Sequence, residues 1–172
     1  MKYRILFSLI YCLSFYPSYS NSDSTIKPED LRNLIGCWKG SLTYLDYTSN
    51  KPFSMPANII VKDFKTNNNI ICSFIYPEEP GANAPDTIFI TKNGRYLNNE
   101  EIKTKKKFKR DSLEILTETE GIDGNDNKAA KIRHTYTLGR NTYSIKKEVQ
   151  FIGQSQWIIR NEYKFIRIKP CQ

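Results

Sequence analysis

Apolar and polar side chains alternate with a period of two along most of this chain. In the run that begins at Gly36, Trp38 and Leu42 fall on one face of an extended segment, and the odd-numbered residues between them are polar. Near the end of the chain, Tyr163 and Phe165 alternate in the same way with charged residues. A two-residue period is typical of strands with one buried face and does not fit an amphipathic helix. The sequence therefore predicts an all-β protein.

Turn signals divide the alternating region into short segments. Asparagine and glycine clusters at 67–69, 93–94, 121–127 and 139–141 each separate two strand-like runs. Regular spacing without intervening helices favours an up-and-down antiparallel β-barrel of about eight to ten strands, because closure removes exposed sheet edges. The predicted strands, about ten in number, cover residues 36–47, 56–64, 69–77, 86–92, 94–98, 101–109, 112–119, 130–138, 141–152 and 156–168.

The first twenty residues have the pattern of a signal peptide. Lys2 and Arg4 precede an apolar run at 5–15, and small residues precede a cleavage position after Ser20. The apolar run is shorter than the roughly 20 residues that a membrane-spanning helix needs. We therefore expect a secreted or periplasmic protein whose residues 21–172 form a single domain, with a short helical lead-in at 28–35.

The positive charge of the chain suggests a surface role. The chain contains 26 Lys and Arg against 18 Asp and Glu, a net charge of +8. Such a balance favours peripheral contact with an acidic envelope surface, and the densest basic run is 103–110. Phe108 is the only aromatic residue in this run, whereas nucleic-acid sites interleave several aromatic residues for stacking. No nucleic-acid partner is expected.

Motifs for catalysis are missing from the sequence. It contains no Gly-x-Ser-x-Gly, no His-Glu-x-x-His and no phosphate-binding glycine loop. His134 is the only histidine, and its alternation with Ile132 and Tyr136 places it on an inward face. We expect no catalytic residues, no metal site and no cofactor.

The start of the first predicted strand resembles that of a known family. Gly36-Cys37-Trp38 follows the lead-in, and a basic residue stands near the end of the last strand. In these features the chain is similar to the lipocalin/calycin superfamily, in particular to small secreted lipocalin-like domains of bacteria. The resemblance implies that Trp38 packs at the closed end of the barrel under an arginine. Since the last strand of a closed meander runs antiparallel to the first, that arginine is expected to be Arg167 rather than Arg160.

The resemblance also implies a disulfide between a middle strand and the C-terminal segment. Cys72 and Cys171 are the candidates, and export to an oxidising compartment would permit the bond. Cys37 with Cys171 is the rival pair, because the end of the chain should return near the first strand. Three cysteines remain after residue 20, so one thiol is left over.

A lipocalin-like barrel has an interior that can hold a ligand. We expect a monomer that binds a small apolar or aromatic molecule there. One alternative is an interior filled by side chains, in a protein that acts through its surface in envelope interactions or inhibition. Another is haem binding through His134, as in barrels of the nitrobindin type, which this length also resembles. The residues expected to line the cavity are Leu42, Tyr44, Phe74, His134, Tyr136, Tyr143, Ile145, Val149, Trp157 and Tyr163.

Overall fold

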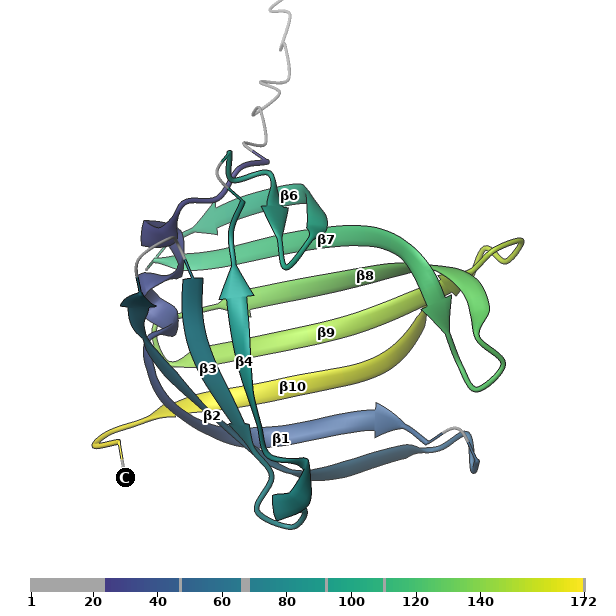
Figure 1. Cartoon of the computed structure of the whole chain (residues 1–172), viewed down its shortest axis with the longest axis horizontal. Coiled ribbons are helices and arrows are strands. Elements are labelled where there is room, and N and C mark those ends of the chain that lie inside the picture. Colours follow the sequence, from purple (N-terminus) through teal and green to yellow (C-terminus); the bar gives the residue numbers. More distant parts are fainter. Residues whose placement is uncertain (1–23, 47, 66–68, 92, 110, 172) are drawn as a thin grey trace, which may run out of the picture.

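The part of the chain that the structure describes forms ten strands that pair antiparallel in a single sheet (Figure 1). The computed structural model describes residues 24–46, 48–65, 69–91, 93–109 and 111–171, so the predicted signal peptide lies outside the described residues. The all-β prediction is confirmed. The strands are β1 (Gly36–Leu45), β2 (Pro52–Lys65), β3 (Asn69–Ile75), β4 (Ala84–Phe89), β5 (Tyr96–Leu97), β6 (Glu100–Phe108), β7 (Ser112–Asp123), β8 (Lys128–Leu138), β9 (Thr142–Phe151) and β10 (Ile158–Ile168).

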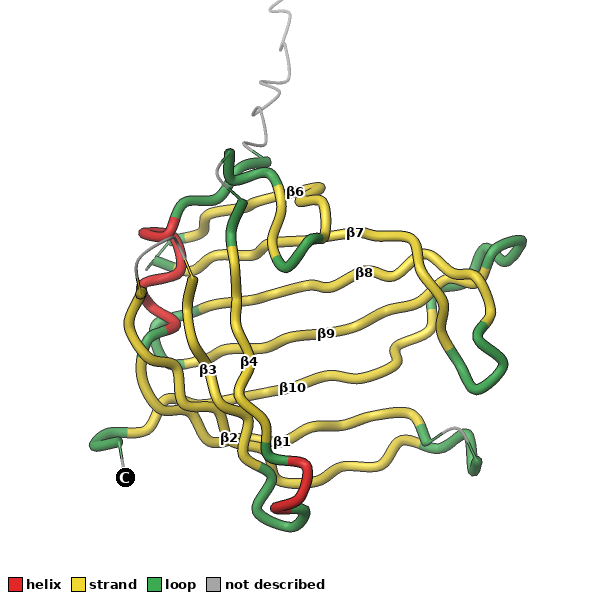
Figure 2. The backbone as a smooth tube through the Cα atoms, in the orientation of Figure 1, coloured by secondary structure: helices red, strands yellow, loops and turns green. Residues whose placement is uncertain are grey.

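The sheet curls into a nearly closed barrel. Its strand order is β4-β3-β2-β1-β10-β9-β8-β7-β6-β5, so the first and last strands of the chain are neighbours inside the sheet. In the described residues, one isolated bridge between Ile90 and Leu97 joins the two ends of the sheet. Figure 2 shows β4 crossing in front of the long strands of the opposite wall. The predicted antiparallel meander is thus present, with a seam between β4 and β5 in place of full closure.

β2 begins four residues earlier than the sequence indicates. Pro52 and Pro56 mark a loop in the sequence, but both lie in the strand and pair with β1. β3 joins β2 only from Asn58 onward, so the proline-containing part of β2 has a free edge. Proline is tolerated at such an edge because no neighbouring strand needs its missing N–H.

The expected helical lead-in is not supported as an α-helix. The segment forms one short 3-10 helix, η1 (Pro28–Leu34), whose Asp30 carboxylate accepts a 2.9 Å hydrogen bond from the backbone N–H of Lys27. η1 buries Leu31 and Leu34 against one end of the barrel, and the Trp38 indole donates a 2.8 Å hydrogen bond to the Leu34 carbonyl. The interior at this end is filled, since the void beneath η1 measures about 10 Å³.

Arg167 closes the same end from outside. It pairs with Trp38 in the β1–β10 register, and its guanidinium lies 4.1 Å from the centroid of the Trp38 ring. The predicted contact is confirmed. Gly36 makes room for it: a Cβ there would lie 2.6 Å from Arg167 Nη1, and its φ of +134° disfavours any other residue. Arg167 also donates a 2.7 Å hydrogen bond to the Ile35 carbonyl.

The disulfide joins Cys37 to Cys171. The predicted pairing of Cys72 with Cys171 is therefore wrong, and the rival pair forms. The register explains the outcome, because Cys37 lies opposite Ile168 and the last residues of the chain run past it. Cys72 is buried on β3, which β2 and β1 separate from β10 in the sheet, and it has a free thiol.

Candidate functional site

The middle of the barrel interior contains a pocket of about 450 Å³. Its walls come from β3 and β4 on one side and from β8, β9 and β10 on the other. The strands place side chains there by their two-residue alternation, which turns every second residue inward. Of the residues predicted to line a cavity, six surround this pocket: Phe74, His134, Tyr136, Tyr143, Ile145 and Tyr163.

Aromatic rings in contact with one another line the pocket or support its lining. The Tyr163 ring lies 5.3 Å from Phe74 and 5.7 Å from Phe165, measured between centroids. Phe165 stacks in turn on Tyr143, at 5.9 Å. These separations are those of favourable ring pairs. The rings therefore support one another and present a preformed surface to a flat or apolar molecule.

A hydrogen-bonded group of side chains forms the polar part of the pocket. Glu100 Oε2 accepts a 2.5 Å hydrogen bond from the Thr117 hydroxyl and lies 2.8 Å from His134 Nδ1. Nearby, the Asn98 side chain bonds to the Tyr136 hydroxyl. Asp86 lines the exposed mouth of the pocket. The pocket therefore offers carboxylate, imidazole and phenol groups at one side of an aromatic surface.

The pocket holds its phenols and its thiol in the neutral state. Burial, followed by the nearby Glu100, raises the pKa of Tyr136 above its ordinary value of 10. Burial and the hydrogen bond with Tyr76 raise the pKa of Tyr163 in the same direction. Burial, with a smaller contribution from Asp86, raises the pKa of the Cys72 thiol to about 12. A thiol with such a pKa is protonated at neutral pH and is a poor nucleophile.

Four predicted lining residues do not line the pocket, namely Leu42, Tyr44, Val149 and Trp157. Leu42 packs against the core, Tyr44 contacts the Phe53 ring, and Val149 is fully buried opposite Ile132 and Ile158.

Trp157 instead packs against Arg133, whose guanidinium carbon lies 3.9 Å from the centroid of the Trp157 ring. The register of β10 shifts between Ile159 and Asn161. Because of this bulge, the residues before it that share the alternation of Tyr163 face outward instead of inward. Ile159, two residues after Trp157 and on the same face, is 53% exposed. Simple alternation from Tyr163 therefore predicts the wrong face for Trp157.

The sequence reasoning missed the polar residues of the pocket. Asp86 and Glu100 each stand two residues before an inward isoleucine, Ile88 and Ile102. Their phase with these apolar residues was a usable signal that carboxylates face the interior. Asn98 had no such signal, since it follows the two-residue strand β5 in a turn with a positive φ of 52°.

Two further buried carboxylates, those of Asp30 and Asp123, form ion pairs at the two ends of the barrel. At the η1 end, Asp30 lies 2.6 Å from Lys107 Nζ and 3.4 Å from Lys105 Nζ. At the far end, Asp123 lies 2.6 Å from Arg160 Nε and 2.8 Å from Lys147 Nζ. These pairs tie η1 and the β7–β8 hairpin to the barrel.

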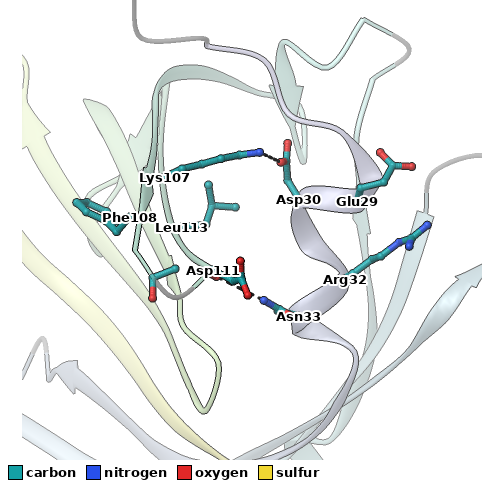
Figure 3. Close-up of a pocket in the computed structure, with 9 residues that line it drawn as sticks. Glu29, Asp30, Arg32, Asn33, Lys107, Phe108, Asp111 and Leu113 are labelled. Carbon is teal, nitrogen blue, oxygen red and sulfur yellow. Dashed lines mark hydrogen bonds and ion pairs between the residues drawn. The ribbon is translucent and has the colours of Figure 1, made fainter. Parts of the chain in front are cut away.

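A second pocket, of about 360 Å³, lies between η1 and the β6–β7 hairpin. Figure 3 shows the Asp30–Lys107 ion pair across it, with Asn33 bonded to the Asp111 carbonyl at 3.4 Å. These two contacts join η1 to the β6–β7 hairpin across the pocket.

Most of the basic run is also ion-paired. Lys105 and Lys107 bind Asp30, Lys103 pairs with Glu101, and Lys106 lies 3.5 Å from Glu114. The alternation of β6 sends its lysines to both faces of the sheet. The run is therefore no continuous cationic surface, and the surface alternative gains no support from it.

No helix in the described part of the chain is long and apolar enough to cross a membrane. Among the same residues, no group of three or more His, Cys, Asp or Glu side chains is arranged to hold a metal ion.

Comparisons with known proteins support the fold. The chain matches no family model and no curated protein sequence. Its structure is similar to that of Rv2717c from M. tuberculosis, with a TM-score of 0.56 and 10% identity, over 82% of this chain and 96% of that chain. A protein of unknown function from the DUF3598 family of Nostoc punctiforme PCC 73102 aligns with a TM-score of 0.39 and 10% identity, over 84% of this chain and 50% of that chain. The similarity to Rv2717c shows that the two proteins share a fold.

Proposed function

We propose that this protein binds a small molecule with an aromatic or apolar body inside the barrel. The observation that carries the proposal is the contrast between the two parts of the interior. At the η1 end, side chains fill the interior and leave a void of only about 10 Å³. The central pocket measures about 450 Å³ and is lined by aromatic rings. Binding pockets for small molecules have this size and this mixture of apolar walls with a few polar groups.

The proposal is binding without catalysis, outside the cytoplasm. The pocket thiol of Cys72 is held protonated by burial, which argues against a nucleophilic role. The Cys37–Cys171 disulfide supports export to an oxidising compartment. N-terminal sequencing of the protein from its source should find a chain that starts at Asn21. An uncleaved N-terminus would contradict export by this signal.

Native mass spectrometry of the protein purified from its source tests the binding proposal. We expect a retained molecule in the wild type. Ala84 lies on the pocket wall, so Ala84→Trp should block the pocket and abolish retention. Ala129 is exposed on β8 and does not line the pocket, so Ala129→Trp should leave retention unchanged. Equal retention by the two variants would place the ligand elsewhere, and an empty wild type would count against the proposal.

Haem binding through His134 is a second candidate, favoured by the surroundings of this histidine. Its ring lines the pocket with Nδ1 held by Glu100, and none of the described residues bonds to its Nε2. Axial histidines are commonly oriented by such a hydrogen bond. A Soret band should form on haem addition and disappear in His134→Ala. The absence of a Soret band in the wild type would end this candidate.

A further inference from the structure

We propose that the ligand of the central pocket is an organic cation, an amine or quaternary ammonium carried on an aromatic or apolar body. This inference rests on the proposed binding function and adds the chemical class of the ligand. It runs against the net charge of the protein, which is +8. The pocket differs from the rest of the molecule in the sign of its charge.

The charged groups of the barrel interior are distributed unevenly. Asp30 and Asp123, at the two ends, each face two cationic side chains. Asp86 and Glu100, in the pocket, face none: no Lys or Arg is among the described residues that line it. Among the described lining residues, His134 is the only side chain with a titratable nitrogen. A protein with an excess of cations therefore leaves two carboxylates with no Lys or Arg partner among the described residues of this pocket, and a bound ammonium group would supply a cationic partner.

Aromatic rings add a second attraction for a cation. The pocket is lined by Phe74 and by four tyrosines, Tyr76, Tyr136, Tyr143 and Tyr163. The face of an aromatic ring attracts an ammonium group, and the attraction increases when water is displaced. Carboxylates beside aromatic rings distinguish a cation from a neutral molecule of the same shape.

The side chains of the pocket already respond to its negative field. Besides burial, Glu100 and Asp86 contribute to the raised pKa of Tyr136, and Asp86 contributes to those of Tyr163 and Cys72. Acidic groups with raised pKa values report a site where additional negative charge is disfavoured. The two carboxylates would repel an anionic ligand in the same way, and they would attract a cation.

Isothermal titration calorimetry at pH 7.5 with three indole probes tests the inference. Tryptamine is cationic, tryptophol is neutral and indole-3-propionate is anionic, and the three share one ring system. We expect tryptamine to bind at least tenfold more tightly than tryptophol, and indole-3-propionate to bind most weakly. Equal affinities for tryptamine and tryptophol, or tightest binding of the anion, would overturn the inference and leave the proposed binding function standing. Failure of all three probes to bind, together with an empty protein from its source, would remove both.

Charge-neutral variants identify the groups responsible. Glu100→Gln keeps an oxygen that accepts from Thr117, and it should lower the affinity for tryptamine about tenfold, the size of effect expected for a partly buried charge, while changing that for tryptophol less than twofold. Asp86→Asn, at the exposed mouth, cannot disturb the core and should lower tryptamine affinity by a smaller factor. Glu114→Gln, on the outer face beside Lys106, is the control and should change neither affinity. Unchanged tryptamine binding in both pocket variants would refute the assignment.

Discussion

The hydroxyl groups of Tyr76 and Tyr163 lie 2.8 Å apart and connect the end of β3, which Tyr76 directly follows, to β10 across the barrel interior. Two strands, β1 and β2, separate β3 from β10 in the sheet. The contact therefore spans the hollow of the barrel instead of following the sheet. Since the Phe74 ring packs on Tyr163 at the same place, this connection sets the width of the pocket.

Removal of either hydroxyl should loosen this connection. We expect Tyr76→Phe and Tyr163→Phe each to lower the free energy of unfolding by about 0.5–1.5 kcal/mol, the net value of a typical hydrogen bond. Urea denaturation of both single variants and the double variant measures the coupling. The double variant should lose less than the sum of the two single losses, because the bond can be lost only once. Strictly additive losses would show that the two hydroxyls do not interact.

Arg167 should be needed for the stability of the closed end. Arg167→Ala loses the contact with Trp38 and the hydrogen bonds to the Ile35 and Arg140 carbonyls. We expect a loss of about 2–4 kcal/mol by denaturant unfolding. Arg167→Lys should restore little, since lysine lacks the planar set of donors. The exposed Lys164, paired with Glu162, is the control. Lys164→Ala should change stability by less than about 0.5 kcal/mol, and an equal effect of the two alanine variants would contradict the assigned role.

The disulfide should stabilise the fold by restricting the unfolded chain. It joins residues 134 positions apart, so Cys37→Ser combined with Cys171→Ser should cost about 2–5 kcal/mol. Alkylation of the unfolded, unreduced protein, followed by mass spectrometry, checks the pairing. Cys72 should be modified, and Cys37 and Cys171 should not. Modification of Cys171 would show that the bond does not form.

Acid should destabilise the protein through Asp123. Burial raises the pKa of this carboxyl, but Lys147 and Arg160 outweigh burial, so the pKa lies below its ordinary value of 3.8. A depressed pKa in the folded state contributes stability at pH values above about 4, and this contribution is lost as the pH falls below that value. The urea midpoint of the wild type should therefore decline between pH 6 and pH 3. The Asp123→Asn variant should have a lower midpoint at pH 6, and its midpoint should decline less steeply. Parallel declines in the two proteins would exclude Asp123 as a source.

Alkali should destabilise the protein through its buried phenols. Burial raises the pKa of Tyr136, Tyr143 and Tyr163 above the ordinary value of 10. The unfolded chain then ionises first, so the stability is complete below pH 10 and falls as the pH rises beyond it. Absorbance at 295 nm should show a group of tyrosines that ionise only together with unfolding, detected by circular dichroism. Ionisation of every tyrosine near pH 10 without unfolding would be inconsistent with this arrangement.

Local patterns in the sequence were sufficient for the strands but not for their ends. Each of the ten predicted strands has a counterpart, because alternation and turn residues act within a few positions of one another. The start of β2 was missed because the tolerance of Pro52 and Pro56 depends on where β3 begins to pair. The face of Trp157 was missed because a bulge in β10 depends on the pairing with β9. Both errors concern a neighbour that a single strand does not specify.

By itself, the sequence determined that this chain alternates as strands and that it can wrap into an antiparallel meander, because both properties follow from the residue period and the turn signals. The family resemblance implied an arginine over Trp38, and the antiparallel relation of the first and last strands selected Arg167. Only the tertiary structure decided that Cys171 bonds to Cys37, that the interior is filled at one end and hollow in the middle, and that Asp86 and Glu100 share one pocket with Tyr163. The reason is physical: the volume and the charge of a cavity depend on which strands face each other and how far apart they lie. Packing across the barrel sets that separation, and the strands come from distant parts of the chain.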